Sequence, residues 1–199
     1  KKREIPVIMY HRVITTENEK GVNGIYVTEE QFEEHLKILK SKGFQSISID
    51  TLISKLILPK GKYIIITFDD GYKDNFDNAI PLLKKYGFNA YIFMITGVKQ
   101  NIWDKESETR LFEIMDDEQI RFASINGIEI GGHTLNHYHL PEIESDVANK
   151  EIIENKNEIE EIIGKEISVF AYPYGEFSEE TISLVKDAGY KYAFTTDKG

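Results

Sequence analysis

The chain has 199 residues, of which 41% are hydrophobic and 29% charged, a balance typical of globular proteins. That length suits one sizeable core, and no stretch rich in Pro, Gly or Ser divides it, so we expect a single domain over residues 1–199. The formal net charge of −10 argues against nucleic-acid binding, which depends on Lys and Arg neutralising phosphates. No apolar run is long enough to span a bilayer, and the absence of cysteine excludes disulfides and thiolate metal ligands.

Short β-branched or aromatic runs alternate with longer amphipathic segments along the chain. Strands are expected at residues 5–10, 44–49, 63–68, 89–95, 127–130, 167–171 and 190–195. Strands that alternate with helices imply parallel pairing, so the pattern suggests either a β/α barrel or a doubly wound sheet.

Several segments between these strands carry signals for helix ends. Capping-box spacing occurs twice, at Thr28 with Gln31 and at Asp116 with Gln119. Glycines stand where helices are expected to end, at Gly43, Gly87, Gly127, Gly164 and Gly189. The longest expected helix, residues 145–163, places four apolar residues on one face: Val147, Ile152, Ile159 and Ile163.

Unusual polar and aromatic residues follow the ends of four predicted strands. They are His11, Asp69 with Asp70, His133 with His137, and Pro173 with Tyr174. In a β/α barrel all of these positions lie on the C-terminal rim, where such enzymes place their chemistry. This shared location favours a barrel over a doubly wound sheet.

The segment ITFDDG, residues 66–71, places the adjacent carboxylates of Asp69 and Asp70 after an apolar strand. Side chains alternate along a strand, so the two acids point in different directions unless the backbone turns there. Two like charges are costly where solvent is poor, which indicates a bound cation or a shared proton. A solvated turn with Gly71 at the bend is the alternative.

The segment GGHTLNH, residues 131–137, places His133 and His137 four residues apart. A helical turn would bring both imidazoles to one side, as two ligands of one metal require, whereas two solvated histidines are the alternative. One carboxylate of the DDG turn would complete a two-His, one-Asp set suited to zinc or a similar divalent ion. The second carboxylate could then accept a proton from water that attacks a carbonyl.

The remaining candidate residues are histidines and aromatic rings. His11 could protonate a leaving amine, or it could be a hydrogen-bonded histidine of an N-terminal loop. The YPYG segment, residues 172–175, offers rings that suit sugar faces and a backbone N–H for an oxyanion, with simple packing as the alternative. Trp103 could form a second platform, and His35 is expected at the surface or boundary of a helix. His139 could line the site or help to close the loop that carries the ligands, and the structural role is preferred.

TFDDG, HTLNH and AYPYG, in this order and on this alternation of strands and helices, resemble the first three motifs of the polysaccharide deacetylases, carbohydrate esterase family 4. The resemblance runs across nearly the whole chain. It implies a distorted seven-stranded β/α barrel that removes acetyl groups from N-acetylglucosamine polymers or, in some members, from xylan. It also implies one divalent metal ion, with zinc favoured over cobalt or nickel. We further expect a monomer that acts outside the cell or at its surface.

The resemblance implies roles for the residues of the first two motifs. Asp69 would be the general base, while Asp70 would bind the metal together with His133 and His137. From the third motif, the backbone N–H of Tyr174 would stabilise the oxyanion.

Other features of the chain resemble one branch of the family. Tyr172 and Pro173 complete the third motif and are expected to contact the substrate. Many members carry a catalytic histidine late in the chain, but here no histidine follows His139. The opening PVIMYHRV is similar to the poly-β-1,6-N-acetylglucosamine deacetylases of biofilm systems, which implies His11 as the acid. Ala171 stands where many members have an arginine that orients the base, and that branch commonly lacks it too.

The favoured hypothesis is therefore a metal-dependent N-deacetylase of a β-linked N-acetylglucosamine polymer, with the β-1,6-linked polymer preferred. A peptidoglycan or chitin-oligomer deacetylase is the nearest rival, and an acetylxylan esterase is more distant. From other classes, a noncatalytic carbohydrate-binding module would need the rings but no general base. A metal-dependent phosphatase or nuclease would also use paired acids, but the sequence has no basic or Gly-rich phosphate cradle.

Overall fold

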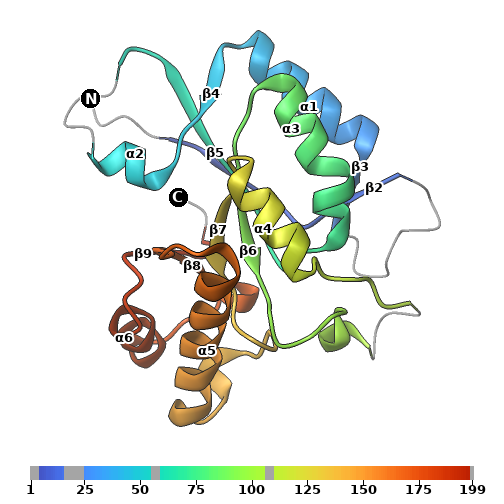
Figure 1. Cartoon of the computed structure of the whole chain (residues 1–199). Coiled ribbons are helices and arrows are strands. Elements are labelled where there is room, and N and C mark those ends of the chain that lie inside the picture. Colours follow the sequence, from blue (N-terminus) through green and yellow to red (C-terminus); the bar gives the residue numbers. More distant parts are fainter. Residues whose placement is uncertain (1–4, 16–24, 55–58, 106–109, 198–199) are drawn as a thin grey trace.

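The structure is a computed structural model that describes residues 5–15, 25–54, 59–105 and 110–197 (Figure 1). The strands predicted from the sequence are all present and form one seven-stranded parallel sheet. They are β1 (Val7–Tyr10), β4 (Phe44–Ser46), β5 (Lys62–Phe68), β6 (Tyr91–Met94), β7 (Glu129–Gly132), β8 (Val169–Ala171) and β9 (Tyr192–Phe194). Pairing follows the order β1-β5-β6-β7-β8-β9, and β4 pairs with the start of β5.

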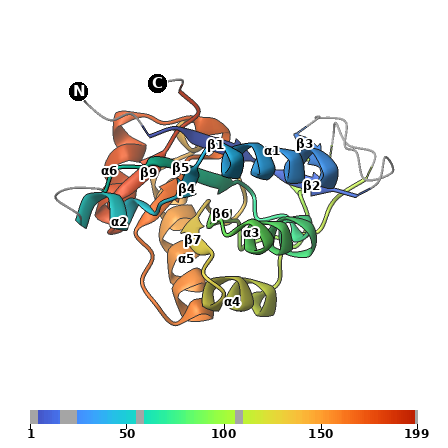
Figure 2. The ribbon, with the colours of Figure 1, turned by 90° about the horizontal axis from the view of Figure 1, so that it is seen from above.

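The helices lie around the outside of the curled sheet, as the view from above shows (Figure 2). They are α1 (Glu29–Ser41), α2 (Ile49–Ser54), α3 (Ile80–Tyr86), α4 (Asp117–Ile125), α5 (Ser145–Ile163) and α6 (Glu179–Asp187). Within the described part of the chain, no pairing joins β9 back to β1, so the sheet is a curled half-barrel. This architecture confirms the expected distorted β/α barrel. Among the described helices, none combines the length and apolarity that crossing a bilayer requires.

Two short strands are absent from the sequence prediction. They are β2 (Arg12–Ile14) and β3 (Tyr26–Thr28), which pair in parallel as a separate small sheet. Runs of three residues carry too little alternation to be recognised as strands. They matter for the site because β2 begins directly after His11.

Strand β7 lies two residues later than predicted. Gly127, with φ of +89°, still belongs to the turn that ends α4, so the strand begins only after it. The strand then includes Gly131 and Gly132, which the sequence pattern assigns to the following loop. A Cβ on Gly131 would lie 2.5 Å from the Phe93 ring. The strand therefore needs a glycine here because the Phe93 ring packs closely against its backbone, and not because the chain turns.

The predicted helix ends are confirmed. Both capping boxes form, at the start of α1 and of α4. The five glycines named as helix ends all adopt positive φ, where glycine carries no steric cost.

Helix α5 has the predicted bounds, and two of the four residues predicted on its buried face, Ile152 and Ile159, are indeed fully buried. Val147 is 43% exposed, whereas the buried side chains are Ala148, Glu151, Ile152, Asn155 and Ile159. Two polar residues therefore lie on the face that packs against the rest of the protein, and both bear on the site.

Candidate active site

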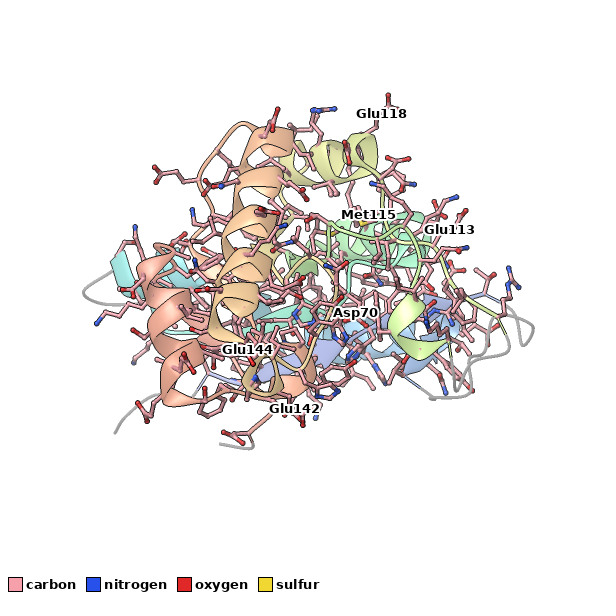
Figure 3. All side chains as sticks on the ribbon, turned by 90° about the horizontal axis from the view of Figure 1, so that it is seen from below. Asp70, Glu113, Met115, Glu118, Glu142 and Glu144 are labelled. Atoms are coloured by element: carbon pink, nitrogen blue, oxygen red, sulfur yellow. The ribbon has the colours of Figure 1, made fainter. Side chains whose placement is uncertain are left out.

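The residues predicted to be catalytic or to bind metal meet at the C-terminal ends of the strands. A hollow of about 210 Å³ there is lined by His11, Asp69, Asp70, His133, His137 and Tyr174, among others. In Figure 3 the labelled Asp70 lies near the centre of the molecule, whereas the labelled Glu118 and Glu142 lie towards its edge. A larger hollow, of about 690 Å³ and bordered by α3 and α4, is lined by none of these residues.

A sharp backbone turn explains how two adjacent carboxylates can serve one hollow. Asp70 and Gly71 both adopt left-handed conformations, with φ of 69° and 70°. The turn directly follows β5, so Asp69 and Asp70 both line the hollow and are only 8% and 2% exposed. A Cβ on Gly71 would lie 2.4 Å from the sulfur of Met94, so this turn requires glycine.

The two histidines meet, but not through the helical turn that their spacing would allow. Thr134 and His137 adopt left-handed conformations, with φ of 72° and 60°. The segment is held by side chains instead, since the Thr134 hydroxyl accepts the His137 N–H at 3.0 Å. The imidazole centroids of His133 and His137 are nevertheless 5.0 Å apart.

Three potential metal ligands converge in the wall of the hollow. Oδ1 of Asp70 lies 3.2 Å from Nε2 of His133 and 3.4 Å from Nε2 of His137, and the three ligand atoms lie within 4.8 Å of one another. Nδ1 of His133 lies 2.7 Å from the carbonyl oxygen of Ala171, which can only accept, so Nδ1 carries the hydrogen. Among the described groups, the buried Oδ1 of Asp70 has no hydrogen-bond partner. This donor set fits a divalent cation.

Burial and charge separate the two adjacent carboxylates. Burial raises the pKa of Asp69, although the nearby charges of His133 and His11 oppose that rise. Burial would also raise the pKa of Asp70, but the imidazoles of His137 and His133 outweigh it and hold the pKa below its usual value. Asp70 is thus kept as an anion that attracts a cation, while Asp69 is the stronger proton acceptor.

The histidines respond to the same environment in opposite ways. Burial lowers the pKa of His137 to about 3, although the charge of Asp70 opposes that fall. Burial would lower the pKa of His133 as well, but Asp70 and Asp69 raise it above its usual value. His137 therefore offers a neutral imidazole, the form in which histidine binds metals.

Aromatic rings flank the metal-site histidine. The Tyr174 ring centroid lies 4.4 Å from that of His137, and the Trp103 centroid lies 4.7 Å from it. Tyr174 also stacks on His139 at 3.7 Å with an interplanar angle of 1°, and Nδ1 of His139 lies 2.7 Å from Oε2 of Glu176. His139 thus braces Tyr174, and it also lines the hollow next to the candidate site. Burial raises the pKa of Tyr174 to about 12, so the phenol is neutral at physiological pH.

The structure does not bring the two other residues of the third motif into the hollow. Tyr172 is 5% exposed and packs against Phe170 and Phe177. Pro173 is buried, at the start of the short 3-10 helix that contains Tyr174. They shape the turn that presents Tyr174, which itself is 41% exposed.

A second hollow adjoins the first. Its volume is about 500 Å³, and it shares Trp103, His137 and Tyr174 with the smaller one. Its further lining includes the exposed side chains of Ile102 and Tyr138. The two hollows therefore offer a continuous surface with several aromatic rings.

The sequence analysis missed the residues that anchor the His11 segment. Asn75 donates from Nδ2 to the His11 carbonyl at 2.6 Å. Nε of the buried Arg12 lies 2.9 Å from Oδ2 of Asp74, and Oδ1 of Asp74 accepts the Val13 N–H at 3.1 Å. A charged Arg12 inside the apolar run VIMYHRVI was the available signal, because such a residue needs a buried partner.

Comparisons with known proteins identify the family of this chain. The family model "Polysaccharide deacetylase" matches residues 58–193. YxkH of Bacillus subtilis, named as a deacetylase of this kind, is 31% identical over 202 residues, covering 100% of this chain and 67% of its own length. The poly-β-1,6-N-acetyl-D-glucosamine N-deacetylase of Staphylococcus aureus is 27% identical over 192 residues, covering 90% of this chain and 64% of its own length. The chain thus spans about two thirds of these relatives.

A solved structure shows the same fold. The Streptococcus pyogenes deacetylase PplD, in complex with acetate, superposes with a TM-score of 0.83 at 26% identity, covering 98% of this chain and 84% of that one. With the family model matching most of the sequence and YxkH aligning along all of it, the chain belongs to the polysaccharide deacetylases, a family of hydrolases.

Proposed function

We propose that this chain is a metal-dependent N-deacetylase acting on a polymer of β-linked N-acetylglucosamine, with poly-β-1,6-N-acetylglucosamine as the favoured substrate. The observation that carries the proposal is the convergence of Asp70, His133 and His137 beside a second buried carboxylate, Asp69. The Staphylococcus aureus relative, whose name specifies that polymer, supports the choice of substrate.

The metal would be held by Asp70, His133 and His137, with zinc favoured and cobalt or nickel as alternatives. A divalent ion bound there would lower the pKa of water and polarise the substrate carbonyl. The Ala171 carbonyl fixes the His133 ring by accepting its Nδ1–H, so that Nε2 faces the site. This contact gives Ala171 a role through its backbone, although it lacks the arginine side chain common in the family.

The other residues would move protons and orient the amide. Asp69, with its raised pKa, would accept a proton from water as the oxygen attacks the acetyl carbon. The backbone N–H of Tyr174 would donate to the carbonyl oxygen as it gains charge. His11 would donate a proton to the nitrogen as the C–N bond breaks, which releases acetate and a free amine. Tyr172 and Pro173 would act by holding the Tyr174 turn.

The adjoining hollow supports a polymeric substrate. It shares a wall with the candidate catalytic hollow and presents Tyr138 and Ile102, so it can take a sugar next to the one that reacts. The net charge of −10 suits a product that gains positive charge with each acetyl group removed. We place this activity outside the cell or at its surface, with residues 1–199 acting as one monomeric domain.

The decisive experiment measures acetate release from β-1,6-linked and β-1,4-linked N-acetylglucosamine oligomers. Zinc-loaded protein should release acetate, and both a chelator and Asp69→Asn should abolish release, whereas the exposed Asp187→Asn serves as the matched control. Faster release from the β-1,4-linked oligomers would favour a peptidoglycan or chitin-oligomer deacetylase. Oligomer binding without any release would contradict the hydrolase and favour a carbohydrate-binding module.

The role of His11 needs a separate test. His11→Ala should lower turnover while the zinc content stays at the wild-type level, because His11 is not one of the three converging ligands. Unchanged turnover would remove the proton-donor assignment without affecting the metal site.

A further inference from the structure

The apolar face of α5 carries a buried glutamate that no catalytic step uses. Glu151 is 4% exposed, and its carboxylate accepts three hydrogen bonds from the segment between the two histidines. Oε2 accepts the backbone N–H of Leu135 at 3.0 Å and that of Asn136 at 2.8 Å. Oε1 accepts the side-chain Nδ2 of Asn136 at 2.6 Å. One carboxylate therefore holds two successive backbone amides and a side chain.

A second buried polar residue lies one turn further along α5. Oδ1 of Asn155, which is fully buried, accepts the backbone N–H of His133 at 3.1 Å. Its Nδ2 donates to the Met94 carbonyl and to the Thr96 hydroxyl, both at 3.0 Å. Because residues four apart share a helix face, Glu151 and Asn155 both accept backbone hydrogen bonds from residues 133–136.

This segment needs outside support because its backbone is strained. Thr134 and His137 are not glycines, yet both adopt positive φ. Such conformations persist only where the surrounding structure holds them. The amides of Leu135 and Asn136, between these two residues, donate to Glu151 instead of to a helix of their own.

We propose that Glu151 is a positioning residue for the metal site: its carboxylate fixes the 134–137 segment in the conformation that turns His137 towards Asp70 and His133. A buried carboxylate is costly, so an apolar residue would fill this space at lower cost if packing were its only role. The proposal rests on the proposed metal site, and it assigns Glu151 no contact with the metal or the substrate.

The chain offers a substitution pair that separates positioning from packing. Glu151→Leu places an apolar side chain of similar volume in the same space but offers no acceptor to the backbone amides of Leu135 and Asn136. Glu151→Gln keeps the acceptor, because its amide oxygen can accept both backbone N–H groups. The Asn136 side-chain amide can then turn so that its oxygen accepts from the new NH2 group. Glu158→Gln, an exposed change on the same helix, is the matched control.

The test measures zinc affinity by competition with a chromogenic chelator, together with the visible absorption spectrum of the Co²⁺-loaded protein. We expect Glu151→Leu to weaken zinc binding about 10- to 100-fold and to change the Co²⁺ spectrum. Glu158→Gln should match the wild type, and Glu151→Gln should retain most of the wild-type affinity. Should Glu151→Leu fail to fold, Asn136→Ala, which removes one of the three hydrogen bonds, should weaken zinc binding by a smaller factor.

Two results would count against different claims. Wild-type zinc affinity in Glu151→Leu, whatever its urea midpoint, would overturn the positioning role and leave the proposed function intact. Absence of zinc binding in the wild-type protein itself would overturn the proposed function, and the positioning role with it.

Discussion

The ion pair between Arg12 and Asp74, which follows His11 in the chain, should contribute strongly to the free energy of unfolding. Arg12 is 4% exposed, and its guanidinium carbon lies 3.4 Å from the centroid of the Phe112 ring. Its Nε lies 2.9 Å from Oδ2 of Asp74, while Oδ1 of Asp74 accepts the Val13 N–H. Asp74→Ala would leave a permanently charged guanidinium buried without this carboxylate.

Removing one partner of a buried ion pair costs about 3–5 kcal/mol. The Asp74 side chain is 17% exposed, so water can solvate part of the site and the lower value applies, about 3 kcal/mol. For a chain of this length each kcal/mol shifts the melting temperature by about 2–4 °C, so a fall of about 6–12 °C is expected.

The assay is urea unfolding at neutral pH, with thermal melting as a second readout. Arg12→Met combined with Asp74→Ala should be less destabilising than the sum of the single changes, because the double variant removes the buried guanidinium together with its carboxylate partner. The exposed pair of Lys73 with Glu113 gives the control, since Glu113→Ala should change stability by less than about 1 kcal/mol. A loss below about 1 kcal/mol for Asp74→Ala would refute the reasoning.

Three further outcomes follow from packing, exposure and charge. Gly132→Ala should lower the free energy of unfolding in urea by about 1–3 kcal/mol, because its Cβ would lie 2.0 Å from the Tyr190 hydroxyl oxygen. Adding Tyr190→Phe should recover part of this loss. An unchanged urea midpoint in Gly132→Ala would contradict the close packing. Tyr138→Ala should raise KM about 2- to 10-fold for acetylated oligomers but not for the monosaccharide, because Tyr138 lines the adjoining hollow. Phe122→Ala, at a similarly exposed ring outside that hollow, should leave KM for the oligomers unchanged. Equal changes of KM in the two variants would exclude the adjoining hollow as a sugar site. Hydrogen bonds from a lysine and a tyrosine of α3 lower the pKa of Glu33 from 4.5 to about 2, so its contribution is complete above pH 4.5 and is lost as pH falls towards 2. The difference in urea midpoint between wild type and Glu33→Gln should therefore shrink as the pH falls from 4.5 towards 2. A difference that grows over this pH range would contradict the lowered pKa of Glu33.

Features with local causes were predictable from the sequence. The capping boxes, the positive-φ glycines and the bounds of α5 each depend on a few neighbouring residues, and all are observed. The strands were located because β-branched and aromatic runs alternate with amphipathic ones, and parallel pairing then brings their C-terminal ends together. That is why residues from separate segments, such as His11, Asp69 and His133, could be predicted to meet.

Features that depend on contacts between distant segments were not predictable. Gly131 belongs to β7 because of the approach of Phe93, which the sequence cannot show. The segment between the histidines avoids a helical turn because Glu151, sixteen residues after Leu135 in the chain, accepts its amides. The sequence does contain a sign of this, since Glu151 is a polar residue on the apolar stripe of α5. Tyr172 was expected to contact the substrate because it belongs to the third motif, but its ring is buried against Phe170 and Phe177.

Zinc titration of the metal-free protein, with acetate release followed at each step, tests the proposed metal site most directly. One equivalent of zinc should bind, acetate release from N-acetylglucosamine oligomers should rise in parallel, and His137→Ala should weaken both. Acetate release that persists in excess chelator, or zinc binding that survives both Asp70→Asn and His137→Ala at wild-type affinity, would contradict the assignment.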